Sequence, residues 1–114
     1  MNLPTIGKST LFGFKYRLIG FGYIPHPSGN GKIQITFFHQ LSESGMFLIC
    51  FSDVSNNQSK EFRKTLRKEL GKVVDANEVI PYVQRSINNT NFEEFQNIMR
   101  IGFKDQAAEL HWKK

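Results

Sequence analysis

The 114-residue sequence has almost no cysteine, the residue whose disulfides and zinc sites stabilise many small folds. A single cysteine excludes an intramolecular disulfide and a cysteine-based zinc site. No apolar run approaches the ~20 residues of a membrane-spanning helix, so we expect no membrane partner. The N-terminal segment lacks the charge and apolar stretch of a secretory signal, and it has too few arginines for a transit peptide. These absences predict a cytoplasmic protein that carries no metal and no cofactor.

The residues that are present describe a folded chain. Hydrophobic residues make up 39% of the sequence and 11 residues are phenylalanine, which is too apolar for a disordered segment. A chain of this length buries roughly two-thirds of its unfolded surface in one core, whereas two domains would each be too small. We therefore expect residues 1–114 to form a single domain.

The first half of the sequence has the pattern of antiparallel strands. From residue 11 to residue 23, aromatic and basic side chains alternate, and Gly20 and Gly22 indicate a bulge or bend in that run. A turn rich in proline and glycine precedes a second alternating run at residues 32–39. The continuous apolar run 46–51 is typical of a central strand covered on both faces. We expect a meander of three or four antiparallel strands.

The second half changes to a helical period. Apolar residues recur at helical spacing in 60–72, in 79–87 after a capping box at 75–78, and in 92–102 after a capping box at 90–93. The tail 103–114 fits either a helix or a strand. Strands followed by helices predict an α+β fold, with two or three helices packed on one face of the sheet.

Basic residues gather in two stretches of the chain. Residues 1–32 hold four basic and no acidic side chains, and residues 60–72 hold six basic against two acidic ones. On a helical wheel the cations of 60–72 lie opposite the apolar stripe that includes Phe62. A solvated helix exterior is the simpler interpretation, but few of these cations have an acidic neighbour at i,i+4. We expect a basic ridge that an acidic partner contacts.

A macromolecular partner is therefore the first functional hypothesis. Phe21, Tyr23, Phe38 and Trp112 lie on the second strand face or near element ends, so we expect some of them to be exposed for contact. The most consistent function is a non-enzymatic protein-binding module of inhibitor, immunity or adaptor type, with a homodimer through an edge strand as a further route. The partner-binding residues that we predict are Lys15, Arg17, Tyr23, His26, Asn30, Arg63, Lys64, Arg67 and Lys68.

Two alternatives stay open. The same basic residues suit the phosphates of a nucleic acid. A metal-independent ribonuclease would use His26 and His39 as its acid and base, although neither lies at a recognised catalytic spacing. Residues 7–10 (Gly-Lys-Ser-Thr) match only the end of a phosphate-binding loop. The motif requires a second glycine five positions before Gly7, and this sequence has Asn2 there. We predict no catalytic residues and consider a binding protein the better interpretation.

Overall fold

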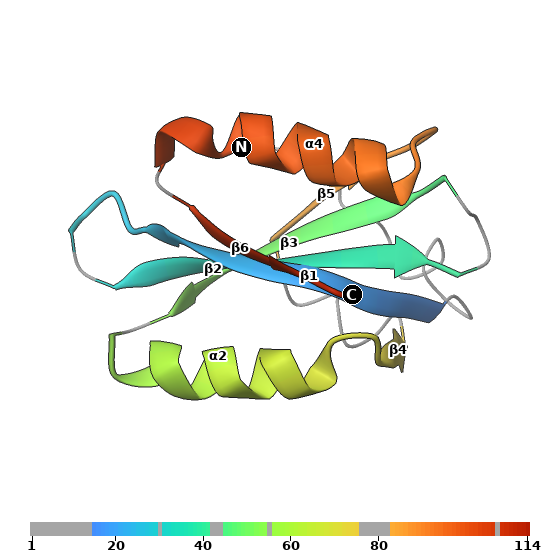
Figure 1. Ribbon diagram of the computed structural model, residues 1–114. Coiled ribbons are helices and arrows are strands. Elements are labelled where there is room, and N and C mark those ends of the chain that lie inside the picture. Colours follow the sequence, from blue (N-terminus) through green and yellow to red (C-terminus); the bar gives the residue numbers. More distant parts are fainter. Residues whose placement is uncertain (1–14, 30, 42–44, 55, 76–82, 107) are drawn as a thin grey trace.

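A computed structural model of the chain describes residues 15–29, 31–41, 45–54, 56–75, 83–106 and 108–114. Over these residues the fold is α+β, with one six-stranded antiparallel sheet and two α-helices on its opposite faces (Figure 1). In chain order the elements are β1 (Lys15–Pro25), β2 (Lys32–Gln40), β3 (Phe47–Val54), α2 (Asn56–Glu69), β4 (Val73–Asp75), β5 (Val83–Ile87), α4 (Phe92–Gly102), the 3-10 helix η1 (Lys104–Gln106) and β6 (Glu109–Trp112).

The sheet is built around the meander of β1, β2 and β3, which confirms that part of the prediction. The strand order is β4-β1-β2-β3-β5, and every pairing is antiparallel. Two short strands share the outer side of β1, because β4 pairs with its residues 15–17 and β6 with its residues 20–23. The outer side of β1 is thus completed by two segments far apart in the sequence.

A β-bulge in β1 lies where the glycines predicted an interruption. The register of β1 against β2 shifts between Leu18 and Gly20, which leaves Ile19 without an opposite residue. Because one extra residue reverses the alternation of side chains, Tyr16 and Leu18 before the bulge face the same side as Phe21 and Tyr23 after it. The bulge therefore lets one long strand keep these four large side chains on a single face.

The expectation that the helices pack on one face of the sheet is wrong. Each face has its own core, and each core is covered by a different helix (Figure 1). The sheet requires this because its central strands are apolar on both sides. The α2-side core consists of Tyr16, Leu18, Phe21, Tyr23, Phe38, Leu48, Cys50 and Leu66. The α4-side core consists of Ile19, Ile24, Ile35, Phe37, Phe47, Ile49, Phe95 and Met99.

The helix expected over residues 79–87 is also absent where the structure describes that segment. Residues 83–87 form β5, which pairs with Phe47–Phe51 of β3. Without β5 the apolar strand β3 would lie at the edge of the sheet, so a segment rich in β-branched residues is used to cover it. Asp75, which opens the predicted capping box, ends β4, and residues 76–82 lie outside the described part.

The other two predicted helices are present. α4 spans the predicted residues 92–102, but its cap is Asn91 rather than Thr90: the Asn91 side chain accepts a hydrogen bond from the Glu94 backbone N–H at 2.9 Å. The tail resolves into η1 and then β6, so the alternation of Ala108, Leu110 and Trp112 was the informative pattern. Within the described ranges, no helix has the length and apolar character needed to cross a membrane.

Candidate binding surface

Helix α2 presents most of its predicted cations to solvent. Leu66 is buried in the α2-side core, and this fixes the helix with Lys64, Arg67 and Lys68 on its exposed surface. The ion pairs of the described residues join other side chains, so no described carboxylate neutralises these three. Phe62, which the helical wheel placed in the core, is 41% exposed. Three unpaired cations therefore lie on the solvent side of α2, whereas the exposed Phe62 ring lies toward the apolar side of the helix.

Arg63 differs from the other cations of α2 because it makes contacts within the protein. Its Nη2 lies 2.9 Å from Oε2 of Glu109 in β6, and its guanidinium lies 5.1 Å from the ring centre of Tyr23. A guanidinium over an aromatic face and against a carboxylate is held in a fixed position. Arg63 therefore fastens α2 to β6, and less of it remains for an external partner.

The expected exposure of the second-face aromatic residues is wrong. Tyr23 is 2% exposed, and Phe21 and Phe38 are also buried, because α2 covers their face. Burial raises the pKa of Tyr23, and Glu109 raises it further, whereas Arg63 and Arg67 lower it. The Tyr23 ring therefore packs under the Arg63 guanidinium and is not exposed to an external partner.

The fold adds cations to α2 that the sequence pattern did not connect with it. At the bulge, the Leu18 N–H donates to the Lys72 carbonyl at 3.0 Å, and the Lys113 N–H donates to the Ile19 carbonyl at 2.8 Å. β4 and β6 thus meet end to end beside adjacent residues of β1, and the carboxyl end of the chain lies beside the end of α2 (Figure 1). The Lys113 side chain reaches Gly71, which follows α2.

We call the resulting surface the basic edge. Its five members are all exposed, and they come from the last turn of α2, the start of β4 and the end of β6. Part of its charge stabilises the fold, because cations near Gly71 lie at the carboxyl end of the α2 dipole. The remainder forms a positive surface that joins the basic stretch 60–72 to the two C-terminal lysines. The basic edge consists of Arg67, Lys68, Lys72, Lys113 and Lys114.

The other predicted partner-binding residues lie elsewhere. Lys15 and Arg17 alternate with residues of the α2-side core, so they face the α4 side, where Nζ of Lys15 lies 3.9 Å from a carboxylate oxygen of Asp75. His26 lies at the opposite end of β1, in the β1–β2 turn. Asn30 is outside the described residues. The predicted set is therefore divided among three places rather than forming one site.

The histidines are also too far apart to act together. His26 follows Pro25, which pairs with Lys32, whereas His39 is seven residues further along β2. At about 3.3 Å per strand residue the two are roughly 23 Å apart, so one scissile phosphate cannot contact both. Nδ1 of His26 lies 2.7 Å from Oγ of Ser28, its Nε2 lies 3.5 Å from Asp53, and His39 stacks on Phe47.

Two further groups with shifted pKa values are parts of the core. His111 in β6 stacks on Phe21 with ring centres 4.8 Å apart, and burial lowers its pKa, with Arg67 lowering it further. Burial raises the pKa of the Cys50 thiol to about 12, which leaves it protonated and unreactive. Among the described residues, no three histidine, cysteine or acidic side chains gather where they could hold a metal ion.

Comparisons with protein-family models, with curated proteins and with solved structures found no match to this chain.

Proposed function

We propose that this chain is a non-enzymatic cytoplasmic binding module, and that the basic edge together with the exposed surface of α2 contacts an acidic surface on another protein. The supporting observation is the convergence of Lys72 and Lys113 at the bulge of β1, which joins two distant parts of the sequence into one positive surface. Such a surface accelerates and orients association with an acidic partner.

A protein fits this surface better than a nucleic acid. Phe62 is 41% exposed on the same helix, and aromatic rings and arginine are the side chains most often found as anchors of protein interfaces. Single-stranded nucleic acids are bound by aromatic rings on which bases stack, and Phe21, Tyr23 and Phe38 are buried. Binding of a duplex would depend on phosphate contacts alone.

The test compares two charge-reversal variants that affect opposite faces of the sheet. Arg67→Glu/Lys68→Glu reverses the basic edge, whereas Lys104→Glu reverses an exposed cation on the α4 side. Both sets of side chains are solvent-exposed, so both variants are expected to fold. Arg63 is left unchanged because its loss would weaken the contact between α2 and β6.

Each protein is used as bait in one extract, and the captured partner is then purified and titrated directly. We expect one partner with an acidic surface that binds the wild type and Lys104→Glu, and that binds Arg67→Glu/Lys68→Glu at least tenfold more weakly. Equal binding by all three proteins would show that the basic edge is not the contact surface.

A nucleic-acid titration tests the alternative. If five cations neutralised five phosphates, affinity would fall about 500-fold between 50 and 200 mM salt, following a slope of about −4.5 in logarithmic units. A fall of that size, abolished in Arg67→Glu/Lys68→Glu, would replace the protein partner with a nucleic acid.

A further inference from the structure

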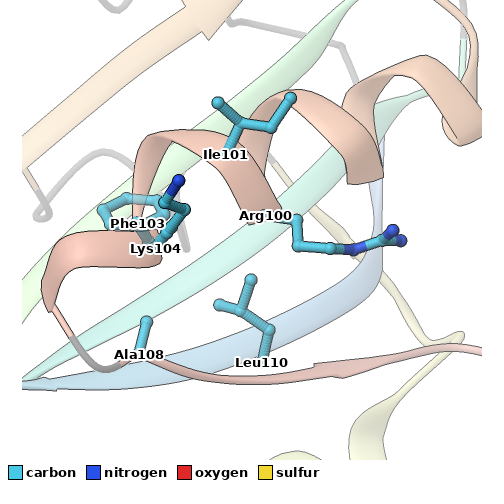
Figure 2. Close-up of a pocket in the computed structure, with 6 residues that line it drawn as sticks. All are labelled: Arg100, Ile101, Phe103, Lys104, Ala108 and Leu110. Carbon is cyan, nitrogen blue, oxygen red and sulfur yellow. The ribbon is translucent and has the colours of Figure 1, made fainter.

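A pocket of about 350 Å³ opens between the carboxyl end of α4 and strand β6, on the face of the sheet opposite α2 (Figure 2). The sheet separates it from the exposed surface of α2. Its volume is at the low end of the range for small-molecule sites, so it suits a small ligand rather than a protein segment. The lining residues are Arg100, Ile101, Phe103, Lys104, Ala108 and Leu110.

The turn from α4 into β6 forms the walls of this pocket. The Phe103 N–H donates to the Met99 carbonyl at 3.0 Å, and the Gln106 N–H donates to the Phe103 carbonyl at 3.1 Å, so the chain reverses within η1. The returning segment then lies beneath α4, with Ala108 and Leu110 pointing toward the helix (Figure 2). The pocket is therefore built from backbone with regular hydrogen bonds.

Most of the pocket surface is apolar. Ile101, Phe103, Ala108 and Leu110 supply it, and Phe103, Ala108 and Leu110 pack against the α4-side core. Ile101 is at the rim and is 74% exposed, and its side chain points away from Ala108 and Leu110 (Figure 2). An apolar ligand would contact the walls formed by Phe103, Ala108 and Leu110, and about 25 cal/mol would be gained per Å² of apolar surface removed from water.

Two cations flank the apolar walls. Arg100 and Lys104 extend on either side of the opening (Figure 2), and the ion pairs formed by described residues include neither of them. The carboxyl end of the α4 dipole offsets part of this charge, and so does the neighbouring Asp105, which does not line the pocket. The nearest carboxylate on β6, Glu109, faces the other side and binds Arg63.

We propose that this pocket binds a small monocarboxylate with an apolar chain, such as a medium-chain fatty acid. The chain lies against Phe103, Ala108 and Leu110, and the carboxylate lies at the opening near Arg100 or Lys104. A purely polar anion would leave the apolar walls without contacts, whereas an alkylammonium ion would be repelled by both cations. A carboxylate on a short hydrocarbon chain satisfies both parts of the surface.

The experiment titrates the full ¹⁵N-labelled chain with hexanoate, heptanoate and octanoate and follows backbone amide shifts. We expect saturable shifts at residues 100–104 and 108–110, and an affinity that increases about fourfold for each added methylene that enters the pocket. Octanol and octylammonium have the same chain length as octanoate but a neutral or a positive head group, so they test the contribution of the carboxylate. Octanol should bind more weakly than octanoate, and octylammonium more weakly still.

Four variants separate the contributions of charge and shape. Arg100→Gln/Lys104→Gln should weaken octanoate about two- to fivefold and leave octanol unchanged, because exposed charges contribute little each. Ala108→Leu fills the pocket and should abolish binding. Ile101→Ser tests the opening without disturbing the core, and Ile98→Ser is its matched control, since Ile98 is also exposed on α4 but does not line the pocket.

The proposal is overturned if octanoate produces no saturable shifts, or if the shifts centre on α2 instead of the pocket. Equal affinities for octanoate and octanol, unchanged in Arg100→Gln/Lys104→Gln, would also overturn the carboxylate assignment. Because Arg67 and Lys68 lie on the other face, Arg67→Glu/Lys68→Glu should bind octanoate normally. A failure of this proposal is therefore distinguishable from a failure of the protein-binding function.

Discussion

Gly22 offers a sharp test of how β6 is held on the sheet. A Cβ atom at this position would lie 2.5 Å from the carbonyl oxygen of Glu109 and 2.7 Å from Cδ2 of Leu110, where ordinary contacts are 3.4–4 Å. Leu110 is the residue that pairs with Gly22, so the obstructing oxygen belongs to a backbone fixed by sheet pairing. Gly22→Ala therefore requires β6 to move away from β1.

The magnitude follows from the cost of overpacking. Inserting a methyl group into a closely packed site costs about 1–3 kcal/mol, and the lower flexibility of alanine in the unfolded chain offsets less than 1 kcal/mol of it. For a chain of this size we take roughly 4 °C of melting temperature per kcal/mol, an intermediate value between those of smaller and larger domains. With about 0.5 kcal/mol offset in this way, Gly22→Ala should lower the melting temperature by about 2–10 °C.

Gly102→Ala is the matched control, because no atom lies within 4 Å of a Cβ at the end of α4. Alanine is favoured over glycine in a helix, so this variant should melt at the wild-type temperature or a few degrees higher. Trp112 is the one tryptophan of the chain, and it lies in β6 against Gly20. Its fluorescence therefore reports detachment of β6 directly, and far-ultraviolet circular dichroism reports global unfolding. An unchanged melting temperature in Gly22→Ala would refute the packing argument.

Three further predictions concern single side chains. Burial holds the pKa of His111 below the ordinary 6.5, so the unfolded chain takes up a proton more readily than the folded one. The free energy of unfolding, measured by denaturant titration, should therefore fall as the pH drops below about 6.5. In His111→Gln this fall should be smaller. Arg63→Ala removes both the Glu109 ion pair and the contact with Tyr23, and it should lower the free energy of unfolding by about 1 kcal/mol, with Arg63→Lys only a partial substitute. Since burial raises the pKa of Cys50 to about 12, a thiol reagent near pH 8 should label the native protein far more slowly than the denatured one.

The features that could be predicted from the sequence are those that depend on neighbouring residues. Alternation gave the strands of the meander, glycine placement indicated the bulge between Leu18 and Gly20, and helical spacing located α2 and α4. These patterns are local because the period of side-chain direction differs between strand and helix. The cap of α4 was misplaced by one residue because Thr90 and Asn91 are both good caps, and only Asn91 accepts a hydrogen bond from the Glu94 backbone N–H.

The errors all involve contacts between distant segments. Residues 83–87 contain apolar residues at spacings compatible with a helix, but the exposed side of β3 needed a pairing strand. Tyr23 seemed free to contact a partner because α2 was expected on the same face as α4. The basic edge was missed because Lys113 and Lys72 are brought together only by hydrogen bonds to β1. None of these contacts leaves a periodic signal in the sequence.

Strand β6 connects the two proposed sites. Its residues alternate, so Glu109 and His111 face α2 while Leu110 and Trp112 face α4, and Lys113 continues into the basic edge. Because Leu110 lines the pocket and the adjacent Glu109 binds Arg63 on the other face, any occupant of the pocket that binds only the folded state stabilises β6. At a hundred times its dissociation constant, such a ligand would add about 2.7 kcal/mol to the free energy of unfolding. Occupancy of the pocket would then favour the arrangement in which the C-terminal lysines lie beside α2, and the two surfaces would be coupled through the strand they share.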